Sequence, residues 1–175
     1  FIGESAGNFT LTTAIENFSA GRNTLLALTT GDNNIALGDS ALTACTTGSF
    51  NVGIGLNALA NCTEGNRNFG IGYRALEDYV NKPASNVGAN IGIGYLALQK
   101  CLEYSNVAIG SEAMGVILKP FYNVAIGFKA LQGTSSAQVE NNVAIGREAM
   151  KDVTYADDCV CIGAYAGTNL TQGDD

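Results

Sequence analysis

Large apolar residues alternate with small ones in short segments that return along the whole chain. The clearest segments read Asn-x-small-x-Gly, where x is Val, Ile, Leu or Phe and the small residue is Ala or Gly. Alternation with a period of two is typical of a β-strand, here about five residues long. Neither face of the strand is polar, so we expect both to be buried. The large face (Val143, Ile145) is expected to fill the core, and the small face (Ala144, Gly146) to lie against a second surface.

These segments recur most often at intervals of seventeen residues, which makes the chain a tandem repeat. There are ten copies, and the steps between their glycines run from sixteen to twenty-two residues, with insertions in the turns at 81–85 and 135–138. We expect one elongated domain of about ten coils over residues 1–175. Both ends fall inside a copy, so we expect a piece of a longer fibre. The coil-turn glycines of the best copies are Gly38, Gly55, Gly72, Gly94, Gly110, Gly127 and Gly146.

The second half of each unit contains an Ala followed by Leu or Met, then an apolar position three residues on, then turn residues such as Thr47-Gly48-Ser49. Seventeen residues suit two short strands and two turns, which predicts an all-β parallel β-roll. The alternative is one strand plus a short helix, as in leucine-rich repeats, because 74–78 and 147–151 have helical composition. We favour the roll, since Ala-Leu pairs followed closely by Thr-Thr-Gly do not sustain a helix.

An asparagine precedes the strand in each good copy. Asparagines in register on stacked coils bond to one another along the stack, and Asn also tolerates turn conformations. We therefore interpret this column as a structural ladder and not as a set of binding residues. It consists of Asn34, Asn51, Asn68, Asn90, Asn106, Asn123 and Asn142.

Composition excludes several classes of function. Apolar residues make up 46% and charged residues 14%, so the chain can bury a core. The net charge is −7 with scattered cations, so we expect no nucleic-acid partner, and no apolar run is long enough for membrane insertion in this segment. The chain has no histidine and no recurrent carboxylate pair, and it has no nucleophile motif. We expect no enzyme activity, no cofactor and no metal.

Five cysteines raise the question of disulfides or a metal site. Cys45, Cys62 and Cys101 occupy an apolar column, which indicates small buried hydrophobes. Cys45 and Cys62 fall on adjacent coils, so a disulfide between them stays open. Cys159 and Cys161 form a lone pair without histidine, which disfavours zinc.

The repeat resembles known fibre proteins. Units such as Asn142-Val-Ala-Ile-Gly146 resemble the heads of trimeric autotransporter adhesins, and the longer unit over 34–49 is similar to repeats in phage and large-virus tail fibres and spikes. The resemblance implies a left-handed parallel β-roll in which three chains associate side by side through small residues. It further implies a location outside the cell, on a virion or cell surface.

Taken together, the repeat and the resemblance predict a structural or adhesive segment of a homotrimeric tail fibre, spike or surface adhesin. Its partners would be two further copies of itself and a host-surface glycan or receptor. The aromatic residues expected to contact a glycan are Tyr73, Tyr95 and Phe128. A monomeric solenoid that binds ice or peptides is the alternative, and a polysaccharide-cleaving spike is a third possibility.

Overall fold

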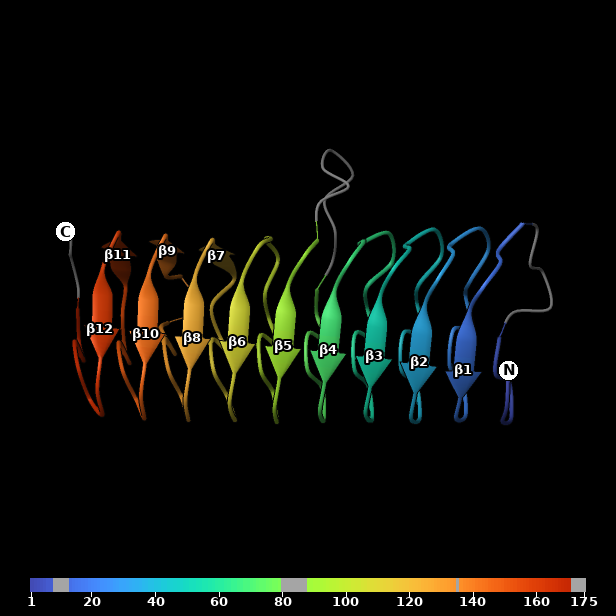
Figure 1. Ribbon diagram of the computed structural model, residues 1–175, viewed down its shortest axis with the longest axis horizontal. Coiled ribbons are helices and arrows are strands. Elements are labelled where there is room, and N and C mark those ends of the chain that lie inside the picture. Colours follow the sequence, from blue (N-terminus) through green and yellow to red (C-terminus); the bar gives the residue numbers. More distant parts are fainter. Residues whose placement is uncertain (8–12, 80–87, 135, 171–175) are drawn as a thin grey trace.

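The computed structural model describes residues 1–7, 13–79, 88–134 and 136–170, so the insertion at 81–85 lies outside the described residues. The chain is an all-β parallel solenoid, and the described residues contain no helix. Successive coils stack into a rod with the first and last strands of the main sheet at opposite ends (Figure 1).

The main sheet has nine parallel strands of three residues, one from each repeat copy except the first, that run along the front of Figure 1. Residues of equivalent repeat position pair, as Ile35 does with Val52 and Val52 with Phe69. Ile2 adds a parallel bridge to Ala20. About eight coils result, fewer than the ten repeat copies, because a coil is complete only between two successive strands. In sheet order, the strands are β1 (Phe18–Ala20), β2 (Ile35–Leu37), β3 (Val52–Ile54), β4 (Phe69–Ile71), β5 (Ile91–Ile93), β6 (Val107–Ile109), β8 (Val124–Ile126), β10 (Val143–Ile145) and β12 (Val160–Ile162).

A second, three-stranded parallel sheet forms only in the C-terminal coils. It contains β7 (Lys119–Phe121), β9 (Gln138–Glu140) and β11 (Tyr155–Asp157), which lie behind the main sheet in Figure 1. The two-stranded coil predicted for the whole chain is therefore present in three coils. In the described part of the other coils, the return path consists of turns and bends.

The helix alternative for the second half of the unit fails for a conformational reason. Residues 74–78 and 147–151 form turns in which alternate residues have a positive φ, 55° at Arg74 and 54° at Leu76, and 55° at Glu148 and 52° at Met150. L-residues do not build helices in this left-handed region. The alternating conformation instead bends the chain round the corner of the coil.

The core is filled mainly by the Ala-Leu column and by the apolar position three residues beyond it. Leu42, Leu59 and Leu76 are fully buried on successive coils, and Cys62 and Tyr79 lie in the next column with at most 1% exposure. Most coils contribute one buried apolar side chain from each column, so the core is an apolar stack along the rod.

The prediction about the two faces of the strand is wrong. Ala144 is fully buried inside the coil, whereas Val143 and Ile145 lie on the outside and are partly exposed. The reason is space: a Cβ added to Gly53 would lie 3.3 Å from Cγ of Leu42 and 3.2 Å from the carbonyl oxygen of Ala58. Because the Leu column already occupies the interior, the inner face of the strand carries only small residues: Ala, Gly or Ser, and Cys161 in the last strand.

The glycine that ends each strand stacks directly on its counterparts. Gly127 has a φ of 135°, and a Cβ on it would lie 2.5 Å from the carbonyl oxygen of Gly146. Both the backbone conformation and the contact between coils therefore require glycine. Gly146 makes the same contact with Gly163, so it belongs to the stack and not to a face open to a partner chain.

Enlarging Ala125 tests this assignment of the faces. We expect Ala125→Leu to lower the free energy of unfolding by about 1–3 kcal/mol, because the added methyl groups must enter a filled core. Ile126→Ala, on the outer face, should cost less in the isolated chain because Ile126 is 37% exposed. Urea denaturation of both variants measures the difference, and the reverse order would contradict the assignment.

Candidate functional site: an exposed apolar wall

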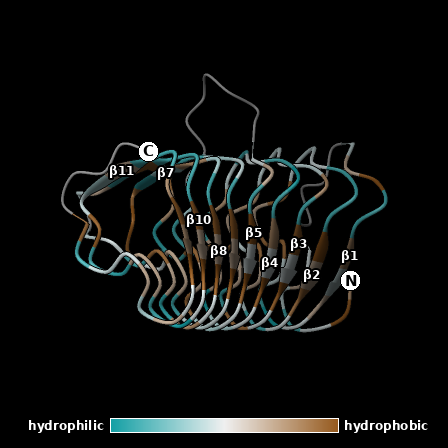
Figure 2. Cartoon of the chain, turned by 60° about the vertical axis from the view of Figure 1, so that its left-hand side comes forward, coloured by the Kyte–Doolittle hydropathy of each residue, from teal (hydrophilic) through white to brown (hydrophobic). Residues whose placement is uncertain are grey.

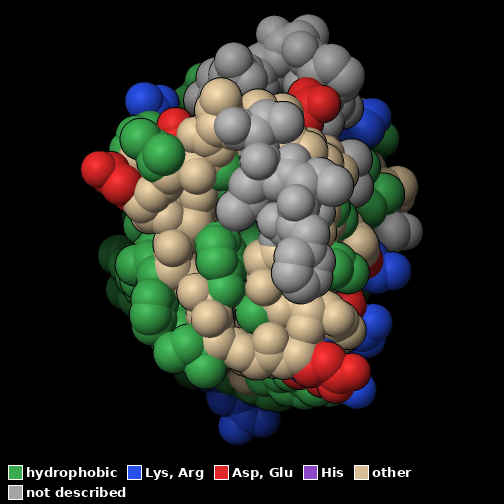
Figure 3. Space-filling model, turned by 90° about the vertical axis from the view of Figure 1, so that its right-hand side faces the viewer, with side chains coloured by type: hydrophobic (Ala, Val, Ile, Leu, Met, Phe, Trp, Pro, Cys, Tyr) green, Lys and Arg blue, Asp and Glu red, His purple; other side chains and the backbone are tan. Residues whose placement is uncertain are grey.

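The outer face of the main sheet carries only apolar side chains. We call this surface the wall; it comprises the first and third residues of the nine strands in the main sheet. End on, hydrophobic side chains gather down one side of the rod, the side that faces the viewer in Figure 1 (Figure 3). The first column contains Phe18, Ile35, Val52, Phe69, Ile91, Val107, Val124, Val143 and Val160, and the second contains Ala20, Leu37, Ile54, Ile71, Ile93, Ile109, Ile126, Ile145 and Ile162.

Each wall residue is partly open to solvent. The exposed fraction reaches 49% at Phe18 and 67% at Ile162. Nine strands at a spacing of ~4.8 Å make a strip about 38 Å long and roughly 10 Å wide. Contiguous apolar patches of several hundred Å² are typical of interaction surfaces. Figure 2 shows the strands of the main sheet as a row of apolar segments with no strongly hydrophilic break. The wall is therefore the candidate functional site.

The predicted glycan-contact residues lie beside the wall, directly after the glycines that end the strands. Tyr73 is 39%, Tyr95 51% and Phe128 42% exposed. The rings of Tyr73 and Tyr95 stack with their centroids 5.3 Å apart, and the Arg74 guanidinium lies over the Tyr73 ring. The Lys129 ammonium lies over the Phe128 ring. These aromatic side chains widen the apolar strip along one edge of the wall.

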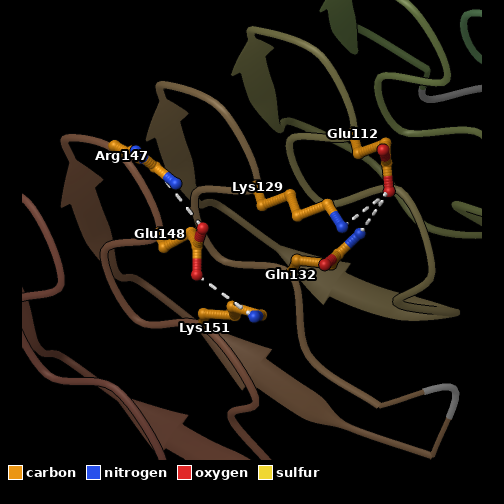
Figure 4. A network of polar contacts seen from close by, with 6 residues as sticks. All are labelled: Glu112, Lys129, Gln132, Arg147, Glu148 and Lys151. Atoms are coloured by element: carbon orange, nitrogen blue, oxygen red, sulfur yellow. Dashed lines mark hydrogen bonds and ion pairs between the residues drawn. The ribbon is translucent and has the colours of Figure 1, made fainter.

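Some charged side chains on the surface pair with one another across or within coils. The Lys129 ammonium lies 3.5 Å from the Glu112 carboxylate, which also accepts a hydrogen bond from Gln132 at 3.0 Å (Figure 4).

On the next coil, Glu148 bonds to Lys151 at 3.1 Å and lies 3.5 Å from Arg147 (Figure 4). The hydrogen bond from Lys151 holds the pKa of the Glu148 carboxyl below its usual range. Each charged side chain among the six residues of this network therefore has a partner within the network.

The asparagine column forms a continuous hydrogen-bonded ladder inside the coil. The Asn51 side-chain oxygen accepts bonds from the backbone N–H of Asn68 at 3.0 Å and from its side-chain amide at 3.1 Å. The Asn51 amide donates to the Gly65 carbonyl at 2.6 Å. The same pattern recurs on each coil from Asn17 to Asn142, and the backbone N–H of Cys159 closes it. These buried amides bond the coils together and are not open to a ligand.

The cysteines are free thiols, and Cys45, Cys62 and Cys101 are buried in the core column. Burial raises the pKa of Cys45 and of Cys101 to about 12, so these thiols stay protonated at physiological pH. They pack as small hydrophobes. Within the described residues, no cluster of three or more His, Cys, Asp and Glu side chains is placed to hold a metal.

In the part of the chain that the structure describes, there is also no helix long and apolar enough to span a membrane. Comparison with protein-family models, with curated proteins and with solved structures found no match. Function therefore has to be argued from the wall and the fold.

Proposed function

We propose that the chain is a structural and adhesive segment of a homotrimeric fibre. In this proposal the solenoid is a left-handed β-roll, and three copies lie side by side along their walls. The observation that carries it is the wall, an unbroken apolar surface that runs the length of the rod. An isolated rod would expose this surface to water, and association with further copies removes it.

The dimensions of the wall support three copies over two. A strip of about 38 by 10 Å covers roughly 400 Å², about half the ~800 Å² per partner of a standard stable interface. Burial of the aromatic edge at Tyr73, Tyr95 and Phe128 would add to this area. Around a three-fold axis each wall meets two neighbours, so that both columns and their edges are covered. A face-to-face pair leaves the edges exposed.

The resemblance to tail-fibre, spike and adhesin repeats supports a location on a virion or cell surface. The proposed role is to project or carry a contact with a host-surface glycan or receptor, and Tyr73, Tyr95 and Phe128 are proposed as glycan contacts at the edge of the wall. We propose a role without catalysis, because the chain has no histidine and no nucleophile motif.

A monomeric binding solenoid is the second candidate. The wall is a regular array of apolar side chains on a single face, which is a geometry suited to an ordered surface such as ice or to an extended peptide. This function would need the wall to stay open in solution.

Sedimentation of the chain separates the two candidates. The fibre proposal expects a particle of about three times 18.1 kDa that persists on dilution. A mass of 18.1 kDa at micromolar concentration would contradict it and would favour the monomeric solenoid.

A further inference from the structure

One column of the repeat changes character between the two halves of the rod. It is formed by the residue two positions before each strand-opening asparagine. In three N-terminal coils this residue is small and polar, and it accepts from the backbone N–H of the preceding coil: Asp32 Oδ1 from Ile15 at 2.8 Å, Ser49 Oγ from Asp32 at 3.0 Å and Asn66 Oδ1 from Ser49 at 2.7 Å. After Gly88 the column reads Tyr104, Phe121 and Glu140, and Asp157 then restores the acceptor. The ladder alone does not require aromatic or long acidic side chains here.

The changed column borders a hollow on the outer face of the second sheet. The strands pair in register, so that Phe121, Glu140 and Asp157 are neighbours, as are Lys119, Gln138 and Tyr155. Six residues line the hollow, which has a volume of about 120 Å³: Lys119, Phe121, Gln138, Val139, Glu140 and Asp157. This volume is below the ~300 Å³ of typical small-molecule pockets, so it suits one ring of a longer ligand.

Three polar side chains of the hollow are unpaired within the described residues, unlike those of the network in Figure 4. The side chains of Lys119, Gln138 and Glu140 make no hydrogen bond or ion pair with the described part of the chain, in contrast to the network of Figure 4. One oxygen of Asp157 accepts from the Glu140 backbone N–H at 3.0 Å, which holds this carboxylate in place. The hollow therefore presents an ammonium, an amide and two carboxylates within one small area.

Aromatic side chains hold one side of the hollow. The Phe121 ring packs edge to face with Tyr104 at 5.3 Å, and Tyr104 packs in the same way with Tyr122 at 5.7 Å. A hydrogen bond with Tyr122 and the nearby Glu140 charge contribute to a raised pKa of Tyr104. The three rings support one another, so Phe121 is held as a firm apolar surface at the edge of the hollow.

We infer that this hollow binds one ring of a neutral glycan. An aromatic surface beside carboxylate, amide and ammonium groups matches a sugar ring, which has an apolar face of C–H groups and a rim of hydroxyls that donate and accept hydrogen bonds. Lys119 against Glu140 and Asp157 leaves a net charge of −1 at the hollow, which disfavours sialylated or sulfated sugars. The inference rests on the adhesive part of the proposed function, and it places a glycan contact away from Tyr73, Tyr95 and Phe128.

The second sheet lies away from the wall, behind the main sheet in Figure 1 and along the upper edge of the coil in Figure 2. Association through the wall leaves its outer face open. Three copies would then present three equivalent hollows, which raises the avidity for a surface that carries many glycans.

Calorimetric titration of the assembled protein with chitotriose, maltotriose, mannotriose and lactose, and with sialyllactose and a heparin hexasaccharide, tests the inference. At least one neutral sugar should bind and the two acidic ones should not. Asp157→Asn keeps the oxygen that accepts from Glu140 N–H but removes a charge, and Phe121→Ala removes the aromatic surface. Each should raise the Kd at least about tenfold, the effect expected from loss of a hydrogen bond to a charged group or of a ring contact.

Glu64→Gln, an exposed carboxylate on another coil, is the matched control and should leave the Kd unchanged. The inference is overturned if no neutral sugar binds, or if Asp157→Asn and Phe121→Ala bind the sugar as tightly as the unmodified protein does. Release of new reducing ends from the sugars would contradict the proposed role without catalysis, since the two carboxylates would then be catalytic. The particle mass is measured in the same samples. A mass of three chains without sugar binding would contradict only this inference, whereas the mass of a single chain would contradict the fibre proposal.

Discussion

Replacing both Ile93 and Ile126 with lysine is expected to convert the proposed trimer into single chains of 18.1 kDa. Both side chains project outward in the second column of the wall. In a trimer the two substitutions place six ammonium groups in an apolar contact with no acidic partner on the wall. Burial of each unpaired charge costs several kcal/mol, so the dissociation constant should rise by several orders of magnitude. Sedimentation velocity measures the change in mass.

Thr30→Lys together with Thr47→Lys is the matched control, because both threonines are exposed in the turns and outside the wall. This variant should keep the mass of three chains. The wall variant should retain its β circular dichroism, since neither isoleucine lies in the coil core. If the wall variant remains trimeric, the interface lies elsewhere on the rod.

Truncation of a central asparagine should be the most destabilising change within a single coil. The Asn106 amide donates to the Pro120 carbonyl at 2.8 Å, to the Tyr104 carbonyl at 2.9 Å and to Asn90 Oδ1 at 3.2 Å, and its own oxygen accepts from the Asn123 N–H at 3.1 Å. Asn106→Ala leaves several of these groups buried without a partner, at about 1–3 kcal/mol each. We expect the free energy of unfolding to fall by about 3–5 kcal/mol in urea titrations.

Asn61→Ala supplies the comparison for this loss. Asn61 is exposed, and its amide donates to the Asp78 carboxylate on the next coil at 3.0 Å. Its removal should cost less than about 0.5 kcal/mol. A similar small cost for Asn106→Ala would mean that the ladder does not hold the coils together.

Much of the architecture was predictable from the repeat. A period of seventeen residues with a recurrent Asn before the strand and a Gly after it predicted parallel, in-register stacking, and the register of Ile35, Val52 and Phe69 follows it directly. The described residues of the second insertion, 136–138, also fall outside the main sheet, although Gln138 opens β9 and does not lie in a turn. These features depend on local residue types or on the period of the repeat, so the sequence alone predicts them.

The orientation of the strand could not be read in this way. Both faces of Val143-Ala144-Ile145 are apolar, so polarity does not mark the inside, and the larger residues were assigned to the core. The volumes of the side chains in one coil would have shown the orientation. The Leu of each Ala-Leu pair already fills the interior, so the large residues of the strand have no room there. The hollow of the second sheet was missed as well, although the change from Ser49 and Asn66 to Phe121 and Glu140 in one repeat column was visible.

The sequence by itself determined the repeat, the parallel β class, the register and the asparagine and glycine columns, because each depends on which residue recurs at which spacing. Only the tertiary structure decided which face of the strand points outward, since that depends on how much space a closed coil leaves after its core is filled. The tertiary structure also brought Lys119, Gln138 and Asp157, from three different coils, into one hollow.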